Sequence, residues 1–505
     1  MSKFSTTNKV ADVKNYMGEK AYTRTPKLEL INAVLTSFID NTYYEKAEKR
    51  LVRIGELVEQ VAKKDPAFVA KLAVFARDEF NMRSSSHVLI GELSRVHRGD
   101  NLVGKALQRI AIRPDDLMET LAYVDKPIPS QIKRGAARAL SAYDEYQLAK
   151  YRGEGKKWSL VDVVNLVRPK HTEALAKLIN GELRNTETWE AMISAAKGDR
   201  EATIAAWKQL LTTNKLPYMA LLRNLRNIAS LNDSELVTLA SEQIADPNRV
   251  RKSRQFPFRF LSAYEALEGA KTSTSSIKFE KDLSGVPMLL EAVEKAINVS
   301  IENLPLLEGT TAILADNSGS MRGDSRGSAL SANSNRKTSD IANLFATLYW
   351  MRADNTYVGL FGDRLLSPKM DRSKGVFENY KAVEHEAANV GPGTEQGIYD
   401  FFRKALADKT KVDRVFIFSD MQIGRNTWYG HEPGTRQTFN QLFKEYKAFN
   451  PDIKVYSVDL RGYGTTVFSD GIYEFAGFSD KLFSIVELAE QDKDALVHSI
   501  EAIQL

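Results

Sequence analysis

The second half of the chain alternates between short apolar runs and longer runs with helical spacing. The apolar runs are typical of buried strands and lie at 310–316, 356–362, 413–420 and 452–460. The helical runs between them lie at 338–352, 395–407 and 436–448. This alternation predicts a doubly wound parallel sheet. A last helical run, from Lys493 to Ile503, is expected to pack on one face of that sheet.

Polar side chains follow the first of these predicted strands. The sequence Asp316-Asn317-Ser318-Gly319-Ser320 comes directly after the apolar run from Thr310 to Ala315. A carboxylate and two hydroxyls at alternate positions of a turn can point three oxygens at one spot. Hard cations such as Mg²⁺ take oxygen ligands in near-octahedral geometry and keep some of their waters. The alternative is that the two serines only cap a helix and turn the chain.

One loop cannot fill the shell of such a cation, so further oxygens must come from elsewhere. Thr394 ends the glycine-rich turn 391–394, and Asp420 ends the strand-like run that begins at Val415. Both are expected at the carboxyl ends of parallel strands, where open α/β folds place their ligands. We therefore predict a Mg²⁺ site, with Ca²⁺ or Mn²⁺ as alternatives, formed by Asp316, Ser318, Ser320, Thr394 and Asp420.

In order and spacing, this set of residues resembles the metal-ion-dependent adhesion site of von Willebrand factor A domains. The resemblance implies direct ligation by Ser318, Ser320 and Thr394. It also implies that Asp316 and Asp420 act directly or through water, and that an acidic group of a partner can complete the shell.

Residues 20 to about 270 are predicted to form helix after helix. Asp65 followed by Pro66 is typical of a helix start. Further helices are predicted at 101–111, 131–149, 172–181, 200–211, 216–229, 234–245, 257–268 and 286–301. Helices of this length joined by short polar links predict an α-solenoid of helix pairs. The polar segment 271–276 is predicted to be a linker, which gives one domain over 1–285 and another over 286–505.

Length and composition limit the class of protein. A chain of 505 residues is too long for one ordinary core, which agrees with two domains. The chain has no cysteine, which excludes disulfides, thiolate metal sites and cysteine nucleophiles. It begins without an apolar leader, and no stretch approaches the ~20 apolar residues of a membrane span. We therefore expect a cytoplasmic monomer without a membrane partner.

Basic residues outnumber acidic ones in the stretch from Gln131 to Lys170. Arg134 and Arg138 are four residues apart, so a helix would project both from one face. Such a face suits phosphates, which dominate nucleic-acid affinity, although basic runs on helices are usually only solvated. The basic residues of this first cluster are Lys133, Arg134, Arg138, Lys150, Arg152, Lys156, Lys157, Arg168 and Lys170, and His171 follows them as a further candidate contact.

A second basic cluster is interleaved with aromatic residues. It contains Arg249, Arg251, Lys252, Arg254 and Arg259 together with Phe256, Phe258 and Phe260. Single-stranded nucleic acids bind where bases stack on rings and charges follow the backbone. The alternative is that the phenylalanines belong to the core. Nearby, Arg223 is a candidate RNA contact, whereas Asn224 is expected to form a hydrogen bond between helical repeats.

Three strings in the helical half resemble the TROVE module of the Ro autoantigen family. They are Ala220-Leu221-Leu222-Arg223-Asn224-Leu225, then Arg254-Gln255-Phe256-Pro257-Phe258 followed by Leu261, and a run from Lys150-Tyr151-Arg152 through Trp158-Ser159 to Arg168-Pro169-Lys170. The resemblance implies a closed ring of HEAT-like helical repeats followed by a von Willebrand A domain. The family often has a histidine directly after the Trp-Ser pair, where this chain has Leu160.

The same resemblance implies a function in RNA quality control rather than catalysis. It implies that small noncoding Y RNAs bind the outer face of the ring and that single-stranded ends of misfolded RNA enter its central hole. An exoribonuclease is an expected further partner. The alternative is a protein-recognition scaffold whose metal site captures an acidic residue. A metal-dependent hydrolase is disfavoured, because no G-x-x-x-x-G-K-[ST] loop is present and only Asp459 and His385 lie near strand ends as acid–base candidates.

Overall fold

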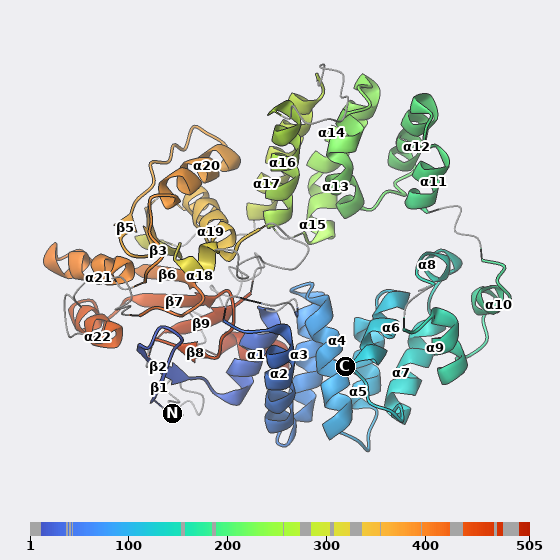
Figure 1. Cartoon of the computed structure of the whole chain (residues 1–505), viewed down its shortest axis with the longest axis horizontal. Helices are drawn as coiled ribbons and strands as arrows, with labels where there is room; N and C mark the ends of the chain where they lie inside the picture. The colour runs from blue at the N-terminus through green and yellow to red at the C-terminus, as the bar shows by residue number, and fades with distance from the viewer. Residues whose placement is uncertain are drawn as a thin grey trace.

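The first half of the chain folds into paired helices that follow a curved path (Figure 1). This computed structural model describes residues 12–505 apart from 37–38, 40–41, 43, 153–156, 184–187, 256, 273–283, 303–307, 324–335, 354, 395, 425–437, 469–471 and 478–493. Within the described residues, no helix is long and apolar enough to cross a membrane.

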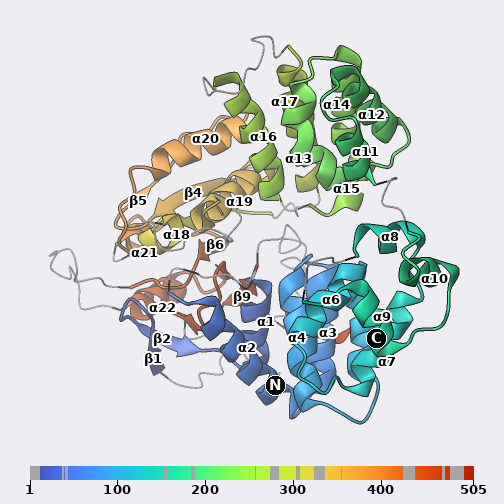
Figure 2. The ribbon, with the colours of Figure 1, turned by 45° about the vertical axis from the view of Figure 1, so that its right-hand side comes forward.

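The helices run along one arc from α1 to α10 and along a second arc from α11 to α17, and Figure 2 shows the same two arcs after rotation. Their bounds are α1 Pro26–Leu35, α2 Ala47–Ala62, α3 Pro66–Asp78, α4 Arg83–Val96, α5 Leu102–Ile110, α6 Pro114–Ala122, α7 Ser130–Leu140, α8 Glu145–Lys150, α9 Leu160–Val167, α10 Glu173–Ile179, α11 Trp189–Ala195, α12 Arg200–Thr212, α13 Tyr218–Ala229, α14 Ser234–Ala245, α15 Pro247–Ser253, α16 Pro257–Thr272 and α17 Val286–Ile301.

Contacts join the two arcs at both of their ends. Lys150 at the end of α8 forms an ion pair with Glu190 of α11, with 3.2 Å between Nζ and Oε1. At the other end, Arg254 follows α15 and donates a hydrogen bond to the carbonyl of Asp78 in α3. The helical repeats therefore form the ring that the resemblance to the TROVE module implied, whereas the helix pattern alone had predicted only a solenoid.

Local capping explains where several helices begin. Asp65 accepts a hydrogen bond from Phe68 N at 3.0 Å, so α3 starts at the predicted cap. The predicted single helix 131–149 is wrong, because α7 ends at Leu140 and α8 begins at Glu145. Asp144 and Gln147 bond each other's main chain in a capping box, which starts a new helix.

The second half contains the predicted sheet, with the strand order β5-β4-β3-β6-β7-β9. Neighbouring strands are parallel except β4 and β5. The elements are β3 Thr311–Asp316, α18 Gly319–Arg322, α19 Thr338–Arg352, β4 Thr356–Phe361, β5 Leu365–Leu366, α20 Val376–Ala387, α21 Gly397–Ala407, β6 Arg414–Ser419, α22 Phe439–Phe449, β7 Lys454–Asp459, β8 Thr465–Thr466, β9 Tyr473–Ala476 and α24 Ala495–Glu501.

Both faces of the sheet are buried, as a doubly wound fold requires. Ala312 and Leu314 of β3 face a core that also contains side chains of α21 and α22. Ile313 and Ala315 alternate with them and face a core shared with α19 and α20. That second core continues without a break into the helical ring, so the sheet and the ring share buried apolar surface.

Packing crosses the predicted division between residues 285 and 286. Helix α17 begins at Val286, yet it packs against α14 and α16 of the ring as well as against α20. Helix α24 was expected on a face of the sheet, but it packs against α3 instead. Lys27 of the neighbouring helix α1 also donates a hydrogen bond to Glu501 of α24 at 2.9 Å. At the other end of the chain, β1 (Asp12–Lys14) and β2 (Lys20–Thr23) form a small antiparallel sheet with β8.

Candidate metal centre and candidate nucleic-acid interface

The predicted cation ligands lie at the point where the strand order of the sheet reverses. Strand β3 is the first of the sheet in sequence, and it lies between β4 and β6. Asp316 is the last residue of β3, and Asp420 follows the end of β6. A crevice outside the carboxyl ends of two strands at such a switch point is where open α/β sheets bind ligands.

Asp316 is held by hydrogen bonds from two neighbouring segments. Ser318 N donates to its Oδ1 at 2.9 Å, and the Ser419 hydroxyl donates to its Oδ2 at 2.5 Å. The carboxyl group has no exposed surface, and this burial raises the pKa of Asp316 to about 6. The Oγ atoms of Ser318 and Ser320 lie 3.4 Å apart.

The two serines do more than start a helix. Ser318 occupies the residue before α18, but its side chain makes no capping hydrogen bond. Both serine side chains are buried, at 1% exposure for Ser318 and 5% for Ser320. The capping alternative therefore does not account for the Ser318 hydroxyl.

One carboxylate oxygen of Asp420 is buried without a hydrogen-bond partner among the described residues. Its Oδ1 accepts a hydrogen bond from Gln422 N at 3.0 Å, whereas Oδ2 is buried and has no hydrogen-bond partner among the described residues. Burial and then the nearby charge of Asp316 raise the pKa of Asp420 to about 7, and the Ser320 hydroxyl acts in the opposite direction. Two buried carboxyls this close cannot easily both be charged without a cation.

Thr394 approaches the same strand end from the glycine-rich turn. Its Oγ1 accepts from Gly424 N at 3.2 Å and lies 3.4 Å from the carbonyl of Gln422. The turn also contacts the first loop directly, because Gly319 N donates to Pro392 O at 2.9 Å. Thr394 is buried, and its hydroxyl is engaged with the main chain that follows Asp420.

This set of residues fits a hard cation. In the part of the chain that the structure describes, no group of three or more His, Cys, Asp or Glu side chains is arranged to hold a metal ion. Here two carboxylates and the serine hydroxyls would supply the oxygens instead, as Mg²⁺ accepts. The unpartnered Oδ2 of Asp420 can accept a further ligand contact, and a bound cation would offset the burial that raises the pKa values of both aspartates.

Further polar residues support the loop that carries Ser318, and the sequence analysis missed them. The side chains of Asn317 and Asn343 exchange two hydrogen bonds of 2.9 Å, and Asn343 also donates to Glu384. Asn343 lies in α19 and is fully buried. An asparagine among the apolar residues of 338–352 was a signal available in the sequence.

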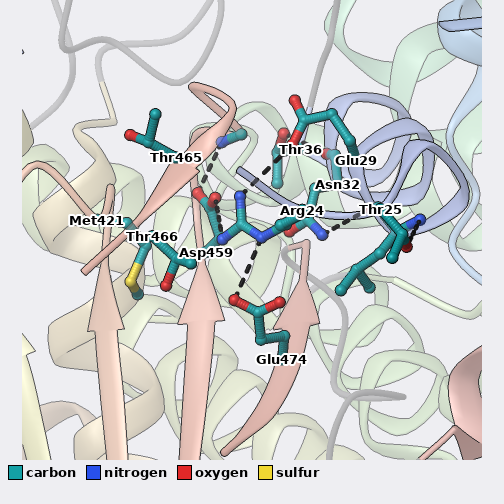
Figure 3. Close-up of polar contacts among 12 residues, drawn as sticks. Arg24, Thr25, Glu29, Asn32, Thr36, Met421, Asp459, Thr465, Thr466 and Glu474 are labelled. Atoms are coloured by element: carbon teal, nitrogen blue, oxygen red, sulfur yellow. Dashed lines mark hydrogen bonds and ion pairs between the residues drawn. The ribbon is translucent and has the colours of Figure 1, made fainter. Parts of the chain in front are cut away.

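The two acid–base candidates do not form a hydrolytic site. The carboxylate of Asp459 at the end of β7 lies 3.2 Å from a guanidinium nitrogen of Arg24 (Figure 3). It also accepts main-chain hydrogen bonds from Arg461 and Gly462. His385 is exposed in the last turn of α20. Asp459 therefore fixes the N-terminal segment to the sheet.

Part of the first basic cluster forms one exposed face. Arg134 and Arg138 of α7 are exposed, and Lys133 beside them is half-buried. The Ser141 hydroxyl donates to Lys170 O at 3.2 Å, which holds the segment 168–171 beside the end of α7. We call Arg134, Arg138, Arg168, Lys170 and His171 the α7 face. Within the described residues, none of these five exposed side chains is engaged in an ion pair.

Other members of this cluster lie elsewhere. The side chain of Lys150 is only 16% exposed and pairs with Glu190 at the junction of the two arcs. Arg152 is half-buried, whereas Lys157 is exposed. Lys156 lies outside the described residues.

The second basic cluster is not one surface. Arg251 forms an ion pair with Glu302 at 2.6 Å, and Arg254 donates to Asp78 across the junction with α3. Phe258 is 3% exposed and Phe260 is 1% exposed, so both rings belong to the core and neither can stack on a base. The core alternative is therefore correct for these two, and Phe256 lies outside the described residues.

Arg223 and Asn224 on α13 differ in their surroundings. Arg223 is exposed. Asn224 donates to Ala220 O at 2.8 Å and accepts from Asn227 at 2.9 Å, so its bonds stay within α13. The expected hydrogen bond between repeats is thus not what holds Asn224, because an asparagine amide one turn from a helical carbonyl bonds locally.

Aromatic rings beside cations occur at a place that the sequence analysis passed over. The guanidinium of Arg113 lies 4.8 Å from the ring centre of Tyr151, and Lys150 Nζ lies 5.7 Å from that of Tyr146. Lys126 approaches the ring of Trp158 at 5.7 Å. Tyr146 is 38% exposed, unlike the phenylalanines of the second cluster. The same aromatic-plus-basic criterion, applied to 146–158, would have found them.

Comparisons with known proteins place this architecture in a family. The TROVE domain model matches residues 19–183 and 179–284, which together span more than half of the chain. Telomerase protein component 1 of Rattus norvegicus is 20% identical over 616 aligned residues, covering 86% of this chain and 23% of that protein. The Mus musculus protein of the same name is 38% identical over 91 residues, covering 17% of this chain and 3% of that protein. The chain thus spans less than a quarter of these relatives.

A solved structure shares the fold over nearly the full length. The crystal structure of the Deinococcus radiodurans Ro (RSR) protein superposes with a TM-score of 0.60 and 15% identity, covering 94% of this chain and 100% of that chain. At this identity the likeness shows the fold, a helical ring joined to a mostly parallel sheet. Because the family match itself covers more than half of the residues, the chain belongs to the TROVE domain family.

Proposed function

We propose that this chain is a noncatalytic RNA-binding ring, in which the α7 face binds the phosphates of a small structured RNA of the Y type. The observation that carries the proposal is the α7 face itself, an exposed group of cations without ion pairs among the described residues. Exposed arginines on one helix face attract the phosphates of a nucleic-acid backbone, and this attraction is long-ranged. Membership of the TROVE family supports the same assignment.

The ring is proposed to accept single-stranded RNA ends in addition. Tyr146, Tyr151 and Trp158 offer stacking surfaces next to Lys150, Arg113 and Lys126. Sequence-independent binding of single strands needs this combination of rings and charges. Binding of misfolded RNA ends, and hence a part in RNA quality control beside an exoribonuclease, would follow from such a site.

The proposal is tested by purifying the full chain from cells with and without nuclease treatment of the lysate. We expect the untreated protein to carry small RNA, seen as absorbance near 260 nm and as extracted RNA of defined length. Nuclease-treated protein should regain binding to a structured small RNA in a fluorescence anisotropy titration at low salt. Protein that leaves untreated cells without RNA and fails this titration would contradict the proposal.

A second candidate function is recognition of an acidic partner through a cation at the sheet edge. The buried, unpartnered Oδ2 of Asp420 beside Asp316 favours it. Mg²⁺ would be held by Ser318, Ser320 and Thr394 with the two aspartates, and a partner carboxylate could fill an open position of the ion. Isothermal titration calorimetry with MgCl₂ tests the cation, and a protein partner released by EDTA would support the recognition function.

A further inference from the structure

The segment 12–24, here called the strap, precedes the helices of the ring. It contains β1, a turn and β2, and α1 of the ring follows it immediately. Strand β1 pairs with β2, and β2 pairs in turn with β8 of the sheet domain, where Tyr22 is opposite Thr466 and Thr23 is opposite Thr465. The strap therefore connects the first helix of the ring to the edge of the sheet domain.

The turn of the strap touches the loop that follows Asp420. Asn15 Nδ2 donates to Ile423 O at 2.6 Å, and Tyr16 N donates to Gln422 Oε1 at 2.7 Å. Gly424 leaves no room for a side chain, because an added Cβ would lie 2.9 Å from the Cβ of Met17. The strap thus covers residues 422–424 closely along their length.

Gln422 links the strap directly to the carboxylate of the candidate metal centre. Its main-chain N donates to Asp420 Oδ1 at 3.0 Å, while its side chain accepts from Tyr16 and donates to Thr465 at 3.3 Å. Gln422 is 1% exposed and Asn15 is 6% exposed, so water does not easily replace these bonds. Asp420 is therefore linked to the main chain of the strap through two successive hydrogen bonds, both made by Gln422.

The end of the strap is fixed by charge at the same edge of the sheet. Arg24 lies among three carboxylates, with Asp459 at 3.2 Å, Glu474 at 3.3 Å and Glu29 of α1 at 3.7 Å (Figure 3). Glu29 also pairs with Arg53 of α2, which donates to the carbonyl of Gly462 after β7. Removing Arg24 would leave three buried carboxylates without the charge that they share, so this arginine holds the anchor together.

We propose that the strap couples the cation site to the ring. A divalent cation that fixes Asp420 also orders Gln422 and Ile423, which receive the hydrogen bonds of Asn15 and Tyr16. Docking of the strap in turn favours cation binding. This inference rests on the proposed metal centre. Linkage requires the two effects to be equal in free energy, so either can be measured. The ring helix α1 follows the strap, so the state of the cation site reaches the ring through covalent continuity.

The experiment compares two variants of the full chain that change the charge equally at adjacent residues. Asn15→Asp keeps the side-chain acceptor for Met17 N and Glu19 N but replaces the donor to Ile423 O. Lys14→Ala removes one positive charge from an exposed side chain of the same strap. Calorimetry should show Mg²⁺ binding ~5-fold or more weaker in Asn15→Asp than in Lys14→Ala, at the low end of typical couplings. The added negative charge alone would favour the cation, so weaker binding isolates the lost contact.

Hydrogen–deuterium exchange of the wild-type chain gives a second measurement that needs no variant. Mg²⁺ should slow exchange in residues 12–24, with the largest effect at Tyr16, whose amide bonds Gln422. If Mg²⁺ binds the wild type but both variants bind equally and exchange in 12–24 does not change, the coupling is wrong while the metal centre stands. If the wild type binds no Mg²⁺, the metal centre fails and the coupling fails with it.

Discussion

The candidate metal centre and the α7 face differ in how their residues come together. The metal centre is buried and draws Asp316 and Asp420 from strand ends about one hundred residues apart, where the sheet topology leaves them little freedom. The α7 face is exposed and draws its residues from two neighbouring segments of the ring. Binding at a buried site depends on each of its residues, because every buried charge or oxygen without a partner costs folding free energy. An exposed basic face depends on the sum of its charges.

The sharpest test of this contrast is Asp316→Ala. We expect Mg²⁺ affinity to fall more than ~100-fold, because even residues that only support metal ligands change affinity by 10–100-fold. Asp371→Ala is the matched control, since Asp371 is an exposed carboxylate of the same domain, and among the described residues its side chain accepts hydrogen bonds only from Ser373. Calorimetry with equal affinities in both variants would rule out the metal assignment. RNA affinity should be unchanged in both.

The pH dependence of stability should separate the buried site from the exposed one. Folding raises the pKa of Asp316 to about 6 and that of Asp420 to about 7, above the ~3.9 of an unfolded aspartate. The folded protein then holds protons that the unfolded chain releases, so stability is lost as pH rises from about 4 to about 7. In EDTA, the melting temperature should fall across this window, and Mg²⁺ should remove the fall. An equal pH profile with and without Mg²⁺ would contradict the site.

For the α7 face, we expect a smaller and additive effect. Arg134→Ala combined with Arg138→Ala should flatten the slope of log K against log salt by up to ~1.8, which is about 0.9 for each phosphate contact. The control is Lys63→Ala combined with Lys295→Ala, which removes the same charge from exposed helix positions at 68% and 62% exposure. Anisotropy titrations at several salt concentrations measure both. Equal slopes would mean that the α7 face is only a solvated surface.

The smallest effect is expected for Lys150→Ala. Lys150 pairs with Glu190 at the junction of the arcs, and such a partly exposed pair contributes ~0–1 kcal/mol. The salt slope of binding to structured RNA should stay at the wild-type value, with Glu190→Ala behaving in the same way. A flatter slope in Lys150→Ala alone would place this lysine on phosphate rather than at the junction.

Several elements could be predicted from the sequence because their signals are local. The strand β3 and the helix α19 lie within one residue of their predicted bounds, since an apolar run or a regular apolar spacing marks each of them. The break between α7 and α8 was not predicted, although Asp144 and Gln147 have the spacing of a capping box. Apolar periodicity continues across such a break, whereas a cap depends on two side chains three residues apart.

The candidate sites were predictable to different degrees. Asp316 and Asp420 could be named because order along the chain and parallel pairing together fix which strand ends meet. Thr394 was also expected at the end of a parallel strand, but it lies in the turn between α20 and α21. For basic residues no such rule exists, so Arg251 and Arg254, which contact Glu302 and the carbonyl of Asp78, were grouped with a nucleic-acid surface. Whether Phe258 stacks on a base or fills the core is likewise not encoded in its neighbours.

By itself, the sequence determined the succession of helices, the alternating half with its buried strands, and the motif from Asp316 to Ser320 that ends the first of them. Only the tertiary structure decided that the strap pairs with β8, that α24 returns to α3, and that Arg24 lies among Asp459, Glu474 and Glu29. The physical reason is the distance along the chain over which each kind of interaction acts. Periodicity and caps act within a few residues, whereas docking of distant segments depends on shape and charge that exist only after the chain has folded.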